Sequence, residues 1–457
     1  MGSIAPPTTV RLPWGGAENI YRRVSLAFKH VDREHWRIHC VCAVSFHGLT
    51  PDEQTTCLRN AWKVLVTEHP RLAVEPDGTT SKTYEVLDNE SIEAWAQDTF
   101  FVEDTRTPDE VIRTTEPRDL PSLHFHRTTS ELVLLSSHWR MDAVGCMMLL
   151  NQLLALTAST PKTTPESPET QISRISAPLE DAANCPPLDA SSASKSYAET
   201  WIENMHRNAI HAGGLPYNGE TTTPPSETTH HDITLTRAST AALLAACKAK
   251  QISVSAAIHA ALAHTVFSFS EDQEFTTVMA VNLRPYLPPP YNGPKHAVQT
   301  YVASIIPTVS RDAPFTDSAR ALSKSYKTWY SEEFIHALRW IYTLHAEKLF
   351  RPPPPSPPSP EAVTPKPPSA VTLSSIGVVE SHIQREYIRK EKGVSVTGFR
   401  FGVTMMTRQM LLYPWTFRDR LTLSLCYNEA YYDLEMAGSV LERLRRVLEG
   451  ELGVELV

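Results

Sequence analysis

The feature that most constrains the fold is an apolar strand that runs almost directly into an apolar helix. Residues 131–136, "ELVLLS", predict a buried strand, and residues 145–156, "GCMMLLNQLLAL", predict a buried helix. Only the eight residues "SHWRMDAV" separate them. A strand that turns into a buried helix within eight residues must pack that helix close to its own sheet, which favours a layered α/β fold.

The same mixture recurs along the whole chain. In the first part we expect strands at 37–47, from 71, at 123–127 and at 131–138, with a helix after each of the first and last. Thr50, Pro51 and Glu53 form a helix-start signature, an N-cap with a capping box and an early proline. In the second part we expect helices at 196–214, 238–251, 253–269, 314–334 and 434–452, and strands at 230–237, 274–287, 301–310 and 370–380, followed by a hairpin within 405–433. Strands and helices do not alternate strictly and no short repeat is present, which predicts two α/β lobes.

Two polar or proline-rich stretches, 157–195 and 351–369, have too little apolar surface to order themselves. We therefore expect an N-terminal lobe at 1–175, a connection between lobes at 176–195, and a C-terminal lobe at 196–457. The second stretch is expected to be an insertion in the C-terminal lobe that loops over solvent.

The composition narrows the class of partner. Of the 457 residues 41% are hydrophobic and 21% charged, the usual balance for a globular protein, and the net charge is −8. That balance argues against nucleic acid or an anionic membrane surface, which need clustered Lys and Arg. The seven cysteines have no metal-binding spacing, so free thiols are expected. No secretory signal or run of about 20 apolar residues is present, so we expect a cytoplasmic protein.

The loop between the opening strand and helix carries His138 and Asp142. A neutral imidazole at a strand end is well placed to take a proton from an alcohol or amine that attacks a carbonyl. Asp142 can either orient that imidazole or cap the following helix, and His138 can equally be a buried histidine bonded to backbone. A zinc site is less favoured, because His124 and His126 have no third ligand at a regular spacing.

"HWRMDAVG" resembles the H-x-x-x-D motif of the chloramphenicol acetyltransferase-like superfamily, which includes BAHD acyltransferases and condensation domains. Four further features agree in order: "AWKVLVTEHPRL", "SVSAAIHAALAHTV", "AVNLRPYL", and the pair "LSSIGVVE" and "LTLSLCYNEAYYD". The likeness covers nearly the whole chain and is greatest to fungal alcohol O-acetyltransferases of the trichothecene 15-O-acetyltransferase kind. Ser137 and Ala143 depart from condensation domains, which usually have a second histidine and a glycine there. The D-F-G-W-G motif of plant enzymes is missing.

The resemblance implies two lobes around a central tunnel, with His138 as the general base that lets an acceptor hydroxyl attack an acyl-CoA thioester directly. It implies a buried salt bridge between Asp142 and Arg284 instead of a His–Asp dyad, with Gly145 supporting the same loop. Oxyanion or substrate contacts are expected from a group of C-terminal-lobe residues, namely Ser374, Ser375 and Asn428.

The function implied by the resemblance is CoA-dependent O-acyl transfer, most simply from acetyl-CoA to a hydroxyl of a small secondary metabolite. The partners are then acyl-CoA and an alcohol, with no metal and no permanently bound cofactor, and the protein is expected to be a monomer. The alternative is a CoA-independent condensation or cyclisation of a polyketide or peptide intermediate on the same fold. The sequence does not identify the acceptor or the acyl chain length.

Overall fold

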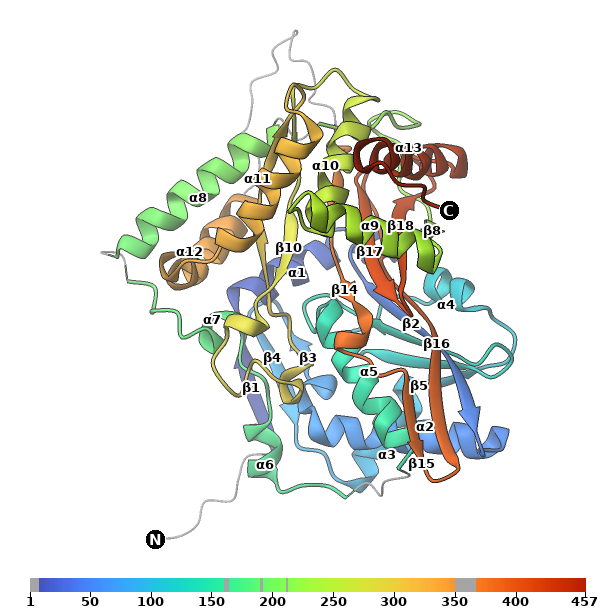
Figure 1. Ribbon diagram of the computed structural model, residues 1–457. Coiled ribbons are helices and arrows are strands. Elements are labelled where there is room, and N and C mark those ends of the chain that lie inside the picture. Colours follow the sequence, from blue (N-terminus) through green and yellow to red (C-terminus); the bar gives the residue numbers. More distant parts are fainter. Residues whose placement is uncertain (1–7, 160–163, 190–191, 211–212, 350–366) are drawn as a thin grey trace. The chain divides into compact units, whose positions relative to one another are not determined.

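The computed structural model describes residues 8–159, 164–189, 192–210, 213–349 and 367–457 (Figure 1). The chain divides into two compact units. Unit 1 contains Met1–Ala183, Asn282–Val302 and Val378–Thr404, and unit 2 contains Asn184–Val281, Ala303–Gly377 and Met405–Val457. The predicted boundaries placed everything after residue 196 in the second lobe. In the structure, two later segments, Asn282–Val302 and Val378–Thr404, belong to unit 1 instead. The second of them supplies strands to the sheet of unit 1.

The centre of unit 1 is a mixed six-stranded sheet. Its order is β15 (Glu386–Arg389), β16 (Lys392–Val403), β2 (Ile38–His47), β7 (Glu131–Ser136), β6 (Ser122–His126) and β5 (Phe100–Glu103). The pairs are antiparallel except β5 with β6. The longest pairing joins β2 to β16, which lie about 350 residues apart in sequence, and it contains a β-bulge between Val396 and Gly398. This pairing explains why the segment after Val378 belongs to unit 1.

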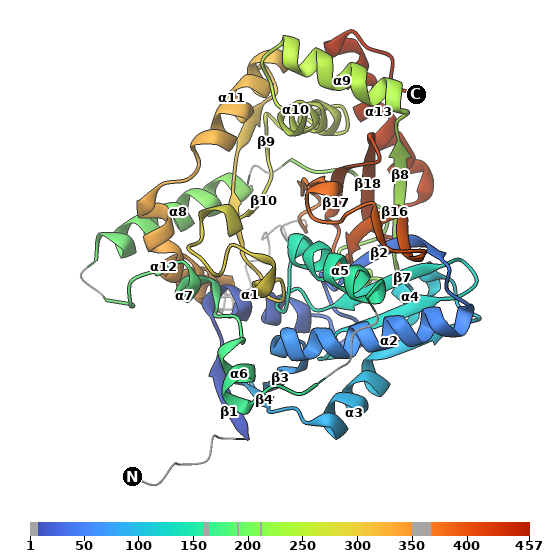
Figure 2. The same ribbon diagram turned by 60° about the horizontal axis from the view of Figure 1, so that its bottom comes forward.

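Helices cover both faces of this sheet. On one face α5 (Ala143–Thr157) packs against β2, β16 and α2 (Pro51–Glu68), and Figures 1 and 2 show α2 and α5 side by side. On the other face α4 (Pro108–Thr114) joins β2 and β7 in a small buried cluster: Val41, Val111, Ile112, Val133 and Leu135. Strand β7 and helix α5 are therefore the buried middle of a layered unit, as predicted.

The remaining elements of unit 1 surround this core. A three-stranded antiparallel sheet has the order β1 (Thr9–Pro13), β4 (Ser81–Glu85), β3 (Glu75–Asp77). The helices are α1 (Gly16–Leu26), α3 (Asn89–Thr99), α6 (Pro168–Ser173) and α7 (Leu179–Ala182). The short 3-10 helices are η1 (Lys29–Val31), η2 (Pro70–Ala73), η3 (Arg284–Tyr286), η4 (Pro294–His296) and η5 (Val379–Ser381).

Unit 2 is built on a second sheet with the order β13 (Val371–Leu373), β17 (Met410–Phe417), β18 (Arg420–Asn428), β8 (Thr228–Thr234), and β14 (Gly377–Val378) also pairs with β17. Two smaller pairs are β9 (Glu274–Thr276) with β12 (Thr308–Ser310) and β10 (Met279–Asn282) with β11 (Val302–Ile305). Helix α10 (Val254–Phe267) is buried almost all round and packs against α9 (Arg237–Ala249), α11 (Phe315–Thr328) and α13 (Leu434–Leu452). Helices α8 (Ala193–Ile210) and α12 (Glu332–Leu349) pack on each other.

Several predicted strands are shorter or broken. Pro70 opens a 3-10 helix where a strand from residue 71 was expected, and β3 begins only at Glu75. The expected strand at 274–287 breaks between Thr276 and Met279 and ends at Asn282, so Arg284 lies in η3 and not on a strand. The strand at 301–310 breaks before Pro307, and that at 370–380 breaks at Ser374. Pro70 and Pro307 stand at two of these positions, where a residue without a backbone N–H cannot donate to a ladder.

The stretch 157–195 is not the structureless connection that its composition predicted. Its residues 167–182 contain α6 and α7, and the buried Gln171 fixes α6 to unit 1. The Gln171 Oε1 accepts from the Tyr84 hydroxyl at 2.6 Å and from the Leu87 amide at 2.9 Å. The well-satisfied side-chain amide of Gln171 thus holds α6 against unit 1.

The predicted proline-rich insertion at 351–369 lies almost wholly outside the described residues. Within the described ranges, no single helix is long and apolar enough to cross a membrane, and α9 with α10, bent by 94° at their break, satisfies length and composition only as a pair.

Candidate active site

The His138 loop is held by the sheet at one end and by a helix cap at the other. Strand β7 ends at Ser136, and α5 begins directly after Asp142, whose carboxylate accepts from the Gly145 amide at 2.8 Å. Between them Arg140 is fully buried and donates to three backbone carbonyls, those of Arg71, Val74 and Asp119. The Thr300 hydroxyl donates to the His138 carbonyl. The loop backbone is therefore fixed before any substrate binds.

Asp142 and Arg284 form the predicted ion pair across 142 positions of sequence. The Arg284 Nη1 lies 2.8 Å from both Asp142 oxygens, and each side chain is only 2% exposed. Asp142 also accepts from the Tyr301 amide at 2.8 Å, while the Arg284 Nη2 donates to the Gln299 carbonyl at 2.8 Å. A buried pair with this many additional hydrogen bonds offsets its desolvation, and removal of one partner would leave an uncompensated charge.

Gly145 lets this ion pair come close to α5. A Cβ at position 145 would lie 2.3 Å from the Ala297 carbonyl oxygen and 3.1 Å from the Arg284 Nη2. The nearer atom belongs to the backbone, which cannot move aside as a flexible side chain could. The structure therefore supports the predicted place of Gly145 beside the loop and supplies its reason, a close approach of helix and backbone.

His138 does not form a dyad with Asp142. Both carboxylate oxygens of Asp142 are occupied by Arg284 and by backbone amides. The His138 imidazole is half-buried, and its Nδ1 has no hydrogen-bond partner on any other described residue. Burial lowers the pKa of His138 below its ordinary value, while the negative charge of Asp142 opposes this shift. The imidazole is thus neutral at neutral pH, as a general base requires.

An aromatic wall, formed by Tyr21 and Trp36, flanks His138. The Tyr21 ring stacks on the imidazole with centroids 4.2 Å apart and an angle of 3°, and the Trp36 ring lies at 6.4 Å. Trp36 has a left-handed backbone, φ 63°, and its amide donates to the Thr404 carbonyl at 2.8 Å. Burial raises the pKa of Tyr21, so its phenol stays uncharged. Neither residue was predicted from the sequence, where the helical spacing of "GAENIYRRVSL" is the available signal.

A buried charge cluster lies in the same unit and was also missed. The fully buried Glu18 is bound by Arg71 and Lys82, and it accepts from the Gln299 side-chain amide at 3.0 Å. Burial alone would raise the pKa of Glu18, but the two cations outweigh it and lower this pKa to about 2. The Gln299 carbonyl also accepts from the Arg284 Nη2, so this one residue joins the charge cluster to the ion pair beside the His138 loop. Isolated charged residues in a sequence give no sign of such pairing.

The other expected site residues lie in unit 2. The Ser374 amide donates to the Leu412 carbonyl at 2.9 Å, and the Ser375 hydroxyl bonds to that of Ser255 at 3.0 Å. Asn428 is fully buried and donates both of its amide hydrogens, to the carbonyls of Ser226 at 2.9 Å and Met405 at 2.8 Å. Both amide hydrogens of Asn428 are thus occupied within unit 2, which does not favour it as an oxyanion donor, and its expected contact with oxyanion or substrate stays a prediction. Asn428 clamps three segments of unit 2 together.

The histidines and cysteines do not gather into a metal site in the described ranges, where no group of three or more His, Cys, Asp or Glu could hold an ion. His124 is bound by Glu103 at 2.8 Å and by Ser122 at 3.0 Å, which leaves both ring nitrogens satisfied within the sheet. All seven cysteines are free and buried.

Comparison with known proteins gives the class. The sequence matches the family described as "Phthiocerol/phthiodiolone dimycocerosyl transferase C-terminus" over residues 224–426. The structure resembles that of TRI3 trichothecene 15-O-acetyltransferase from Fusarium sporotrichioides, with a TM-score of 0.78 at 17% identity over 97% of this chain and 96% of the other. The chain therefore has the same fold as that protein, with two mixed α/β units and an H-x-x-x-D loop in the first.

Two relatives narrow the family further. The chain is 46% identical over 447 residues to the O-acetyltransferase pigM of Monascus ruber, covering 96% of this chain and 85% of the relative. It is 42% identical over 445 residues to "Azaphilone biosynthesis cluster protein M" of Aspergillus terreus (strain NIH 2624 / FGSC A1156), covering 96% and 95%. The chain belongs to this family of fungal O-acetyltransferases of secondary metabolism. The predicted family, fold class and acyltransferase activity are confirmed, and the condensation alternative has support from the fold alone.

Proposed function

We propose that this O-acetyltransferase moves the acetyl group of acetyl-CoA to a hydroxyl of an azaphilone-type secondary metabolite, with His138 as the general base. The names of the two relatives support both acetyl transfer and this acceptor class. The expected co-substrate, acetyl-CoA, follows from the same relationship.

The reaction needs one proton to be moved twice. As the acceptor oxygen attacks the thioester carbonyl, its proton passes to the neutral imidazole of His138. The tetrahedral intermediate then collapses, the C–S bond breaks, and the CoA sulfur leaves with the proton from the imidazolium. An ester and free CoA result, and no acyl-enzyme is formed. The oxyanion requires a donor, for which Ser374 and Ser375 remain our candidates.

The observation that supports this assignment is that His138 is half-buried and uncharged, whereas the charged residues of the same loop are held in structural contacts. Asp142 and Arg140 are bound by ionic and backbone contacts, so neither can act as the base. The lowered pKa of His138 keeps the imidazole in its basic form through neutral pH. Turnover should therefore fall with acid only below the ordinary histidine range of about 6.5.

The test is a coupled assay of the purified protein with acetyl-CoA and a panel of hydroxylated azaphilones. Free thiol release, together with a mass increase of one acetyl group on the acceptor, is the expected result. Thiol release without acetylated product would show hydrolysis, and product formation without acetyl-CoA would return the reaction to the condensation class.

A further inference from the structure

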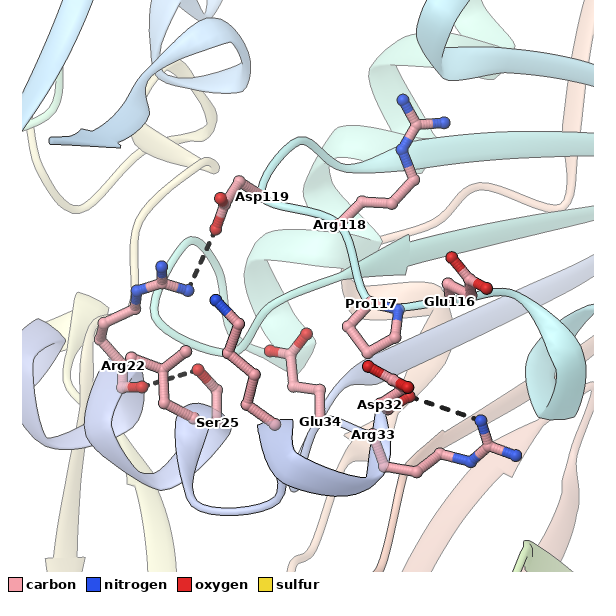
Figure 3. A pocket seen from close by; sticks show the side chains of 11 residues that line it. Arg22, Ser25, Asp32, Arg33, Glu34, Glu116, Pro117, Arg118 and Asp119 are labelled. Atoms are coloured by element: carbon pink, nitrogen blue, oxygen red, sulfur yellow. Dashed lines mark hydrogen bonds and ion pairs between the residues drawn. The ribbon is translucent and has the colours of Figure 1, made fainter. Parts of the chain in front are cut away.

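A polar pocket lies beside the His138 loop and has no part in the chemistry above. Its volume is about 170 Å³, and it is formed within unit 1 by the end of α1, the turn around η1 and the loop that precedes β6 (Figure 3). Four of its lining residues are cationic: Arg22, Lys29, Arg33 and Arg118. We call it the Glu34 pocket, after the carboxyl at its floor.

Glu34 is a buried acid with an unused oxygen. Its residue is 6% exposed, its carboxyl points into the pocket in Figure 3, and its Oε1 has no hydrogen-bond partner among the described residues. Burial raises the pKa of Glu34 to about 7; a hydrogen bond from Ser137 and the charges of Arg37 and Arg22 act in the opposite direction, and Asp119 adds to the rise. A buried polar atom without a partner is costly unless something else binds it.

The cations around Glu34 are only partly neutralised. Arg22 forms an ion pair with Asp119 at 3.0 Å, and Arg118 forms one with Asp98. Lys29 is exposed and has no ion-pair partner in the described ranges, and the guanidinium of Arg33 reaches only the Asp32 carbonyl, at 3.4 Å. Asp32, Glu116 and Asp119 supply negative charge at the rim. With Arg22 and Arg118 paired, Lys29 and Arg33 are matched in number by Asp32 and Glu116, and protonation of Glu34 removes one further negative charge from the pocket.

Residues of the pocket are close in sequence to His138 and to the residues that contact its ring. Ser137, which acts to lower the pKa of Glu34, immediately precedes His138 in the sequence. Arg22 follows Tyr21, which stacks on the His138 ring, and Trp36 lies two residues after Glu34. Residues of the pocket are therefore chain neighbours of residues that contact His138.

We propose that the Glu34 pocket binds an anionic oxygen of the acceptor, a carboxylate or an enolate, through a hydrogen bond donated by the Glu34 carboxyl and the positive charges of Lys29 and Arg22. The proposal rests on the proposed function only in taking the acceptor as the molecule that carries this oxygen. A protonated carboxyl is a strong donor to an anion, and nearby cations stabilise the bound charge. The unsatisfied Oε1 then gains a partner when the pocket is filled.

The proposal fixes the sign of a pH dependence. The anion binds the form of the protein in which Glu34 carries a proton, so binding takes up protons when pH is above the pKa of Glu34. Since that pKa is about 7, affinity should fall about tenfold between about pH 6 and about pH 8, in proportion to the competent fraction. The other charged groups around Glu34 are the basic residues Arg22, Lys29, Arg33, Arg37 and Arg118 and the acidic residues Asp32, Glu116 and Asp119.

The experiment is calorimetric titration with benzoate as carboxylate probe, cyclohexane-1,3-dione as enolate probe and benzamide as neutral control. At least one anion should bind better at the lower pH with proton uptake, and benzamide should bind much more weakly. The probe that binds should also compete with the acceptor in the acetylation assay. Titration needs no turnover, so it stays informative if the proposed reaction is wrong. Absence of binding by both anions, or binding without competition, would overturn the proposal.

Three variants locate the effect. Glu34→Gln keeps a donor that does not titrate, so binding should persist without the pH dependence; Lys29→Gln should weaken binding several-fold at both pH values. Glu116→Gln removes an exposed carboxyl from the rim of the same pocket and should leave the pH dependence intact. Thermal unfolding establishes that each variant is folded. A pH dependence that survives in Glu34→Gln would contradict the role of Glu34.

Discussion

Two buried glutamates of the same unit, Glu18 and Glu34, have pKa values that are shifted in opposite directions. Glu18 is fully buried, yet Arg71 and Lys82 lower its pKa to about 2. Glu34 is nearly as buried, but its cations lie around a pocket and its pKa rises to about 7. Burial is similar, so the difference comes from direct ion pairing. The cluster that is fully paired stabilises the unit, and the acid with a free oxygen remains available to a ligand.

The largest effect is expected when the paired glutamate loses its charge. Glu18→Gln leaves Arg71 and Lys82 without a carboxylate in the interior, which should cost about 3–5 kcal/mol of unfolding free energy. Chemical denaturation measures this loss. Glu93→Gln, at an exposed pair with Lys63, is the control and should change stability little. Equal losses in the two variants would remove the distinction between paired burial and surface charge.

A comparable loss is expected at the ion pair beside His138. Asp142→Asn keeps the size of the side chain but leaves the buried Arg284 charge unpaired, so we expect a loss of about 3–5 kcal/mol and little remaining turnover. Denaturation and thiol release measure the two consequences. Asp104→Asn, in an exposed pair with Arg127, is the matched control. Full stability of Asp142→Asn would mean that this pair does not hold the loop.

Gly145→Ala should have a smaller effect on stability. The added methyl group would meet the Ala297 carbonyl, and a local shift of α5 away from that backbone should cost about 1–3 kcal/mol. Thermal unfolding measures it, with Gly450→Ala, where nothing lies near the new Cβ, as the control. If Gly145→Ala is as stable as its control, helix and backbone are not in close approach.

The smallest expected effect is on the pH dependence of stability, to which Glu18 and Glu34 contribute with opposite signs. The folded pKa of Glu18 is below its ordinary value, so its stabilisation is present above about pH 4.5 and is lost as pH falls toward 2. The folded pKa of Glu34 is raised, so its ionisation lowers stability as pH rises from about 4.5 to about 7. Glu34→Gln should therefore stabilise the protein by on the order of 1 kcal/mol at pH 8 and by less at pH 5. Unfolding curves at both pH values test this; a Glu34→Gln variant that is less stable at pH 8 contradicts it.

Local patterns in the sequence predicted the strand and helix that hold His138, but they did not predict contacts between residues far apart in the sequence. The apolar runs around the loop and the capping box at Thr50 are determined by neighbouring residues, and the structure has both. The contact of Asp142 with Arg284 came from the family resemblance and is present, although Arg284 lies in a 3-10 helix. The pairing of β16 with β2 joins residues too far apart for any local pattern to encode. A role at the site could not be predicted for Tyr21, Trp36 and Glu34, because they come near the His138 loop only when the chain is folded.

The central claim is that His138 supplies the base while its surroundings supply structure. It is tested most directly by comparing His138→Ala with His47→Ala, which removes another half-buried histidine, at the end of strand β2 in the same sheet. Steady-state acetylation, with circular dichroism to establish the fold, is the measurement. The account predicts that His138→Ala folds normally and loses about 10²-fold or more in kcat, while His47→Ala retains most of its turnover. Near-wild-type kcat in a folded His138→Ala would contradict it.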